Sequence, residues 1–246
     1  MSPLVLGTLA SLFTGLLTSA GGIFLLAGKK KVDNLNPIFI GFSAGIMFAA
    51  SIFSLFIPAL ERGNIYIVLA TFLLGAIFVD IFDDVLPHEH LLRGLEGPPS
   101  KIKMVGLILV AMLIHNFPEG MAVGIGFVEG FSPQAISLAF AIGLQNIPEG
   151  ASVALPLVVM GYSPWKALFV TFLTGMVEPI GGFLGVLLGS IFTKALPYLM
   201  SFAAGAMVYV VSDEMIPESH KLGEEKIGTF SFIIGFLIMT LLDNIL

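Results

Sequence analysis

The sequence contains HNFPEG at residues 115–120 and QNIPEG at residues 145–150, two copies of the pattern N-x-P-E-G. In each copy the first residue and the glutamate are four positions apart, so on a helix both side chains project from one face. The proline removes a backbone donor and clashes with the carbonyl four residues back. Within a membrane, such an interruption is tolerated only beside a cavity or a bound polar group. The duplicated pattern therefore predicts two Pro-broken, kinked helices that flank a polar site.

The composition is that of an integral membrane protein. Of the 246 residues, 57% are hydrophobic and only 11% are charged, and the mean hydropathy is +1.00. A soluble domain usually carries about 25% charged residues. Lipid must therefore be the solvent for much of the surface. The chain has no cysteine, which excludes disulfides, thiolate zinc sites and cysteine nucleophiles.

Eight apolar runs are long enough to cross a bilayer, because a spanning helix needs roughly 20 mostly apolar residues. They lie near residues 4–27, 36–59, 65–86, 102–127, 133–160, 165–192, 196–218 and 228–245. The connections are short except for the loop 87–101. We therefore expect an all-α integral membrane protein with eight transmembrane helices in a single domain, 1–246.

Basic residues predict how the spans are oriented. If the N-terminus is outside, the outer connections hold only Arg62 and Lys194. The inner connections then hold the other lysines and arginines, namely Lys29, Lys30, Lys31, Arg93, Lys101, Lys103, Lys166, Lys221 and Lys226. This bias agrees with the positive-inside rule and, with eight spans, places both termini outside. The first run lacks a basic start, so we expect a retained anchor and not a cleaved signal.

Glycines at four-residue spacing indicate close helix packing. The pairs are Gly41/Gly45 and Gly120/Gly124, and the series is Gly181/Gly185/Gly189. Small residues at this spacing let two backbones approach. They predict a compact bundle and nothing about its function.

The duplicated motifs carry ligands that suit a divalent transition metal. Consecutive spans are antiparallel, so their polar faces can meet near the bilayer midplane, as at transporter sites. An imidazole, two carboxylates and amide oxygens without a thiolate suit zinc, whereas calcium prefers an all-oxygen shell. The alternative is that His115 and Asn146 only hydrogen-bond to neighbouring helices. The metal site is favoured because the two copies of the motif carry six polar residues at matching positions, namely His115, Asn116, Glu119, Gln145, Asn146 and Glu149.

Other spans contribute further candidates. Glu178 shares a helix face with Thr171 and Thr174, and a buried acid in a span indicates function. Met47 could offer a sulfur ligand, although its spacing alone favours packing. Possible pathway residues outside the central site are Ser54, Asp83, His88, His90, Met207, Asp213, Glu214, Glu218 and Asp243. For the inner acids and the two loop histidines, ordinary solvated polarity remains the alternative.

Several other functions lack their motifs. Gly41-Phe42-Ser43-Ala44-Gly45 matches G-x-S-x-G, but it lies inside an apolar run and not in a strand-turn-helix. Neither an H-E-x-x-H pair nor a phosphate-binding G-x-x-x-x-G-K-[ST] loop is present. We expect neither an enzyme nor a nucleic-acid partner. The partners expected are the metal substrate and the lipid bilayer.

At the two motifs the sequence resembles the ZIP (zinc- and iron-regulated transporter-like) metal transporters. The glutamine that opens the second copy is similar to the bacterial GufA-like branch, and the resemblance covers essentially the whole chain. It implies an inverted repeat, in which spans one to three correspond to spans six to eight around spans four and five. It also implies a homodimer, elevator-like alternating access and the inner membrane of a bacterium.

The resemblance also implies a binuclear metal site. It places the first ion at Met47, His115, Gln145 and Glu149. It places the second ion at Asn116, Glu119, Asn146, Glu149 and Glu178. Many relatives have histidine where this chain has Gln145, and some have aspartate where it has Asn146. The transported ion is expected to be zinc, and the sequence does not separate it from cadmium, iron, manganese, cobalt or nickel.

Three functions can be weighed on these residues. The first is a carrier that imports divalent metal into the cytoplasm. The second is an intramembrane hydrolase in which Glu119 or Glu149 acts as base on zinc-bound water. The third is a metal sensor without flux. The duplication of the motif favours the carrier, because transport symmetry explains two copies and hydrolysis does not.

Overall fold

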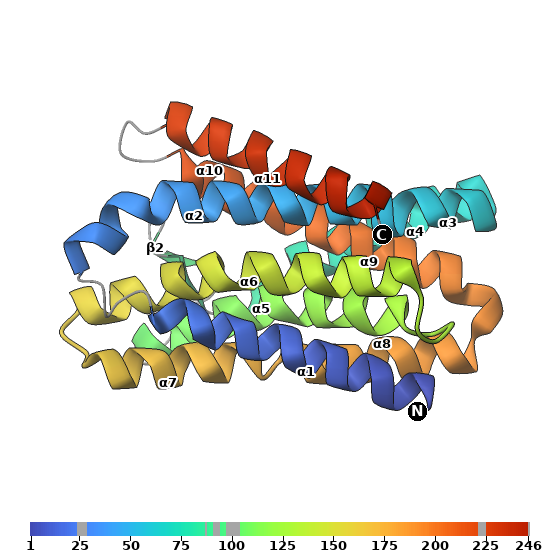
Figure 1. Cartoon of the computed structure of the whole chain (residues 1–246), viewed down its shortest axis with the longest axis horizontal. Coiled ribbons are helices and arrows are strands. Elements are labelled where there is room, and N and C mark those ends of the chain that lie inside the picture. Colours follow the sequence, from blue (N-terminus) through green and yellow to red (C-terminus); the bar gives the residue numbers. More distant parts are fainter. Residues whose placement is uncertain (24–28, 87, 91–93, 97–103, 221–224, 246) are drawn as a thin grey trace.

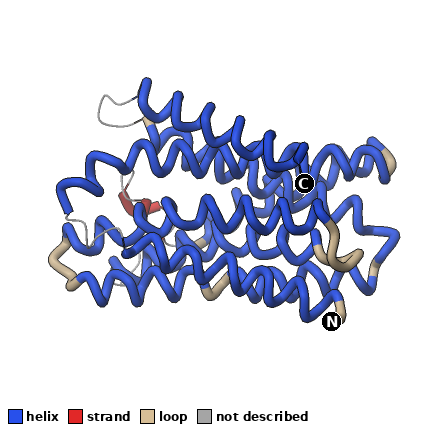
Figure 2. Tube along the Cα trace, in the orientation of Figure 1, coloured by secondary structure: helices blue, strands red, loops and turns tan. Residues whose placement is uncertain are grey.

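A computed structural model describes residues 1–23, 29–86, 88–90, 94–96, 104–220 and 225–245, without the side chains of 29–34, 88–90, 94–96 and 104. The described chain is a bundle of long helices that run roughly side by side (Figures 1 and 2). The two chain ends lie at the same end of the bundle (Figure 1). We refer to this end as the terminal end and to the other as the loop end.

The element order agrees closely with the predicted runs. The helices are α1 Pro3–Gly21, α2 Lys29–Ala49, α3 Ile57–Arg62, α4 Ile65–Val85, α5 Met104–Gly126, α6 Pro133–Val159, α7 Pro164–Gly175, α8 Glu178–Ile191, α9 Leu196–Val210, α10 Ile216–Ser219 and α11 Glu225–Ile245. Two π-helical segments, η2 Ala50–Phe56 and η4 Val211–Met215, and one 3-10 turn, η3 Thr193–Ala195, connect some of them.

In the described ranges, seven helical segments are long and apolar enough to cross a membrane. They are Pro3–Gly21, Leu35–Arg62, Ile65–Val85, Val105–Gly126, Pro164–Ile191, Thr193–Ser219 and Glu225–Ile245. The predicted span at 133–160 is not among them, although α6 is 27 residues long. This helix carries Gln145, Asn146 and Glu149, which lower its mean hydropathy, and it packs against α1 and α2.

Ser-Pro pairs begin three of the long helices. Ser2, Ser132 and Ser163 each accept a hydrogen bond from a backbone amide of the first turn of α1, α6 and α7. A proline follows each serine, where its missing amide would have no intrahelical partner. The sequence therefore determines where these helices start. The start of α2 differs from the prediction, because Lys29–Lys31 are helical and do not form a loop.

The interruptions of the helices differ from those expected. Pro118 and Pro148 lie inside α5 and α6, which run through them as continuous helices, so a full break at either motif is wrong. The break lies instead between α7 and α8, directly before Glu178. Two further distortions are the π segments η2 and η4, each followed by a proline in α3 or α10. Short π segments are frequent at functional sites.

The predicted glycine seams are present. A Cβ at Gly41 or Gly45 would collide with the backbone of α11 at Gly228 or Phe232. The glycines of α5, Gly120 and Gly124, contact the backbone of α8 in the same manner, and Gly181 and Gly185 contact α5 in return. The backbones of these helix pairs are therefore in direct contact, and a residue larger than glycine does not fit between them.

Several glycine contacts occur in matched pairs, in which the residues of one contact correspond to residues 160 positions away in the other. Gly45 of α2 contacts Phe232 of α11, and Gly205 of α9 contacts Phe72 of α4. The reciprocal contacts join Gly235 to Phe42 and Gly75 to Phe202, so each of the four glycines belongs to an F-x-x-G sequence. At the same separation, Gly15 of α1 and Gly175 at the end of α7 contact each other's carbonyl groups.

Two short strands modify the all-α prediction. β1 His88–His90 and β2 Gly94–Glu96 form an antiparallel ribbon at the loop end, with His88 opposite Glu96 and His90 opposite Gly94 (Figure 2). The ribbon lies in the connection that the sequence predicted to be the longest. It leaves the helical class of the fold unchanged.

The α2–α11 seam gives a direct stability test. We expect Gly45→Ala to lower the melting temperature in detergent by several degrees, because an added methyl overpacks the interface at a cost of about 1–3 kcal/mol. The matched control is Gly126→Ala, where the new Cβ would meet only the flexible end of Leu138 and lie near Ala135. Equal melting temperatures for the two variants would contradict the role of the seam.

Candidate metal centre

The two motifs are brought together by a hydrogen bond between α5 and α6. The side-chain amide of Gln145 donates to Oε1 of Glu119 over 2.8 Å. Both residues are buried, as are Asn116, Asn146 and Glu149. The expectation that the polar faces of these two spans meet is therefore met at this pair. Ser43 of α2 adds a contact by donating to the backbone carbonyl of Gln145 over 2.8 Å.

His115, the first residue of the first motif, contacts the π segment η4. Its Nε2 lies 2.5 Å from Oε2 of Glu214 in η4, a residue that the sequence placed in the pathway. His115 and Glu149 also line a small cavity of about 60 Å³, together with Glu218 of α10. The histidine thus connects the motif helices to two of the predicted pathway acids.

Glu178 is fully buried at the first turn of α8 and is held by three donors. Its Oε2 accepts from the hydroxyl of Thr14 at 2.6 Å. Its Oε1 accepts from the amide of Asn146 at 2.7 Å and from the hydroxyl of Thr18 at 3.3 Å. The positive end of the α8 dipole also favours a carboxylate here. Glu178 therefore lies beside the second motif, as the sequence predicted.

Sequence reasoning missed Thr14 and Thr18. Single threonines in an apolar helix carry no chemical signal of their own, because their hydroxyls usually bond to the preceding turn. A comparison of the first and sixth spans could have found them. S-L-F-T-G at 11–15 precedes the similar T-F-L-T-G at 171–175 by 160 residues, and the same interval separates Thr18 from Glu178.

The two motif asparagines make equivalent contacts. Nδ2 of Asn116 donates to the carbonyl of Thr174 at 3.1 Å, and Nδ2 of Asn146 donates to the carbonyl of Thr14 at 2.9 Å. Each amide is thereby fixed with its nitrogen toward a neighbouring helix. The carbonyl oxygen of each amide, its metal-binding atom, has no hydrogen-bond partner within the described part of the chain.

Unpartnered buried oxygens are concentrated in the two motifs. Among the residues that the structure describes, those in the motifs are Asn116 Oδ1, Glu119 Oε2, Gln145 Oε1, Asn146 Oδ1, Glu149 Oε1 and Glu149 Oε2. Burial of polar groups without partners is costly, above all for a carboxylate. Carboxylate and amide oxygens beside an imidazole suit a divalent transition metal. Every motif position predicted to bind metal through oxygen thus keeps at least one oxygen available.

The histidine and the acids are not gathered into one compact cluster. No three histidine or acidic side chains lie close enough to hold a metal among residues 1–23, 35–86, 105–220 and 225–245. The hydrogen bonds explain this arrangement, since Gln145, Asn146 and the threonines occupy carboxylate oxygens and Glu214 occupies His115. The amide-rich composition of the second motif separates the acids.

The remaining predicted residues lie in several places. Met47 and Met207 are fully buried in α2 and α9, and no described contact tests either as a ligand. Asp83 and Asp213 are half-buried toward the loop end. The side chains of His88 and His90 lie outside the described residues, so their predicted role is untested.

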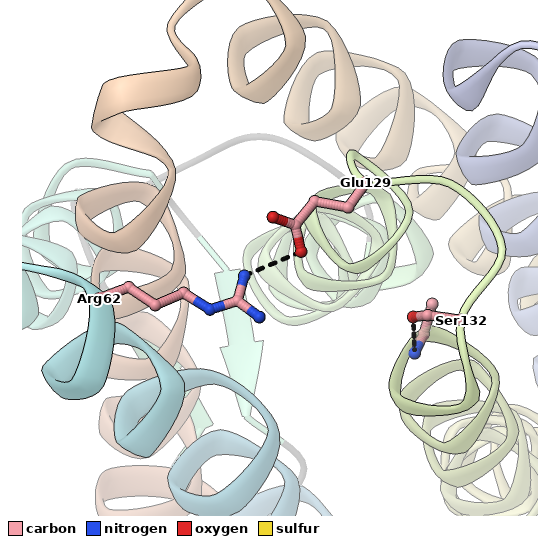
Figure 3. Close-up of polar contacts among 4 residues, drawn as sticks. Arg62, Glu129 and Ser132 are labelled. Atoms are coloured by element: carbon pink, nitrogen blue, oxygen red, sulfur yellow. Dashed lines mark hydrogen bonds and ion pairs between the residues drawn. The ribbon is translucent and has the colours of Figure 1, made fainter.

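Ser54 and Asp243 lie at the terminal end, where Ser54 donates to Oδ1 of Asp243 over 2.8 Å. Both line a cavity of about 320 Å³ that also includes Arg62 and Glu129. Nη1 of Arg62 lies 2.9 Å from Oε2 of Glu129, which joins the end of α3 to the α5–α6 connection near Ser132 (Figure 3). Two residues that line this cavity thus form an ion pair between separate parts of the bundle.

Comparison with known proteins now places the chain. Residues 88–243 match the family model described as "ZIP Zinc transporter". The chain belongs to the ZIP zinc-transporter family. This membership confirms the resemblance seen in the two motifs, and it makes the chain a transporter and not an enzyme, so the hydrolase alternative is wrong.

Named relatives support the family assignment over nearly the whole chain. The zinc transporter GufA of Myxococcus xanthus is 41% identical over 96% of this chain and 97% of its own length. The zinc transporter ZIPB of Bordetella bronchiseptica is 37% identical over 93% of this chain and 77% of its own. The zinc transporter ZIP11 of Xenopus tropicalis is 33% identical over 98% and 97%. The GufA-like assignment is thus confirmed, and the chain is a multi-pass membrane protein.

The unpartnered carboxylate of Glu149 gives a test of the centre. We expect Glu149→Gln to raise the melting temperature of the metal-free protein by several degrees, because a buried uncompensated charge is removed. The same variant should lose the zinc-induced rise in melting temperature that bound ligand gives the native protein. Glu225→Gln, an exposed acid at the start of α11, is the control. An unchanged zinc-induced rise in Glu149→Gln would exclude Glu149 as a ligand.

Proposed function

We propose that this ZIP-family protein carries divalent transition-metal ions, zinc foremost, across the inner membrane of a bacterium into the cytoplasm. The observation that carries the proposal is the set of unpartnered buried oxygens on both motifs, which lie beside His115 in the middle of two long helices. A bound divalent cation would compensate these oxygens. The relatives that cover the chain are named zinc transporters, which favours zinc over the other ions.

We infer two neighbouring metal positions. The first position is formed by His115, Gln145, Glu149 and Met47. The second position is formed by Asn116, Glu119, Asn146, Glu149 and Glu178. Glu119 and Glu149 are able to bridge the two metal ions. The hydrogen bonds from Gln145 to Glu119 and from Asn146 to Glu178 support the proximity of these groups. The free oxygen on each amide supports their use as ligands.

The chain is proposed to be one domain of eight spans in an inverted repeat, with α6 as the span that composition alone misses. The repeated contacts 160 residues apart support the relation of spans one to three with spans six to eight. The equivalent bonds of Asn116 and Asn146 support the relation of spans four and five. Both termini at one end of the bundle support an even number of crossings (Figure 1).

We propose alternating access from the family resemblance. At the terminal end, proposed to be outside, the Ser54–Asp243 hydrogen bond and the Arg62–Glu129 ion pair join separate elements. His115 and Glu149, near the middle of α5 and α6, share a smaller cavity of about 60 Å³ with Glu218 of α10. An elevator movement and a homodimer remain proposals from the family resemblance.

Metal uptake into sealed proteoliposomes with a zinc-sensitive dye inside tests the function. Native protein should transport zinc, and Glu149→Ala should abolish uptake while the protein remains folded in detergent, because an acid assigned to both positions is lost. Glu225→Ala removes an exposed acid and should retain uptake. Competition by cadmium, iron, manganese, cobalt and nickel would then rank the substrates.

Retention of half the native rate in Glu149→Ala would refute the assignment of the transport site. Zinc binding by the native protein without any uptake would favour the sensor over the carrier.

A further inference from the structure

The three buried acids near the motifs differ in how they are compensated. Both oxygens of Glu149 lack a hydrogen-bond partner in the described ranges, and Glu119 has a donor on one oxygen. Glu178, in contrast, has donors on both. Hydrogen bonds to a charged group are among the strongest in proteins. An ion that approaches Glu178 therefore competes with protein donors, and its affinity depends on what those donors do when they are displaced.

Thr14 has an alternative acceptor within reach. Its Oγ1 lies 2.6 Å from Oε2 of Glu178 and 3.0 Å from the backbone carbonyl of Ser11. A hydroxyl carries one hydrogen and can donate to only one of these acceptors at a time. Thr14 can therefore release Glu178 without leaving a buried donor unpaired.

In the sixth span, the residue equivalent to Thr14 donates to the carbonyl three residues back. Thr174 stands 160 residues after Thr14, and its hydroxyl donates to the carbonyl of Thr171 at 2.7 Å. Thr171 is the counterpart of Ser11 at the same separation. The bond to the carbonyl three residues back is thus a geometry that this sequence context supports on a helix of this bundle.

We propose that Thr14 is a positioning residue for transport, whose hydroxyl holds Glu178 when the site is empty and turns to the Ser11 carbonyl when Glu178 binds the metal. The hydrogen bond in the empty site lowers the affinity of the ion at Glu178 and so speeds its release, and the exchange limits this penalty by keeping the hydroxyl paired. Asn146 differs, because its two amide hydrogens already donate to the carbonyl of Thr14 and to Oε1 of Glu178. The inference rests on the proposed function and assigns a role in it to α1, which lies outside the residues that match the family model.

Thr14→Val tests the exchange, since valine keeps the shape of the side chain and removes the hydroxyl. The empty site loses a donor and the metal-bound site does not, so zinc should bind more tightly. We expect the dissociation constant of the weaker zinc ion, titrated as zinc chloride in detergent, to fall about tenfold, the size expected for one hydrogen bond to a charged group. In proteoliposomes the KM and the kcat for zinc should both fall, because release becomes slower.

Thr14→Ser keeps the hydroxyl and should restore native values, which a purely steric role of the threonine would not predict. Thr8→Val is the matched control, because Thr8 donates its hydroxyl to the Leu4 carbonyl on the same helix, away from Glu178. If Thr14→Val does not fold, Thr18→Val removes the weaker donor to Glu178 and should shift KM and kcat in the same direction by less.

Weaker zinc binding in Thr14→Val would overturn the proposal, since the hydroxyl would then act as a ligand. Unchanged KM and kcat would overturn it as well. Both results require native protein that transports zinc. If native protein and the Thr8→Val control fail to take up zinc, the proposed function fails and not the role of Thr14.

Discussion

A carboxylate buried in an apolar bundle must be compensated, because each uncompensated ion costs several kcal/mol. The bundle places Glu119, Glu149 and Glu178 in its interior and compensates them unequally. Within the described residues, one donor contacts Glu119, none contacts Glu149 and three contact Glu178. This difference in hydrogen bonding would let the proposed site attract a cation and still release it. In that proposal Glu149 supplies the attraction, and the donors around Glu178 stabilise that acid when no metal is bound.

The close approach of the helix backbones makes this arrangement possible. Thr14 reaches Glu178 because Gly15 and Gly175 let α1 contact the end of α7, and Gly120 lets α5 contact α8 at Glu178 itself. The break before α8 then places Glu178 in a first turn, where the helix dipole and the threonine hydroxyls converge. Glycine packing, helix break and acid thus form one unit. A side chain larger than glycine at these contacts would separate the donors from the acid they stabilise.

Much of this could be predicted from the sequence, since hydropathy locates the spans and the duplicated motifs identify the central residues. Other features could not be predicted. The helices remain continuous through Pro118 and Pro148, because the loss of one hydrogen bond is tolerated inside a packed bundle. The donors Thr14 and Thr18 are inconspicuous until the fold brings α1 against Glu178. The hydrogen bonds from Gln145 to Glu119 and from Asn146 to Glu178 depend on how the helices pack, which hydropathy does not encode.

The central claim is that the motif oxygens around Glu149 form the metal site. Diffraction data collected at the zinc absorption edge from crystals of the zinc-loaded protein test it most directly. The account predicts an anomalous peak between α5 and α6 in contact with His115 and Glu149, and its loss in Glu149→Gln. Anomalous peaks confined to the ends of the bundle, with none between the two motif helices, would contradict it.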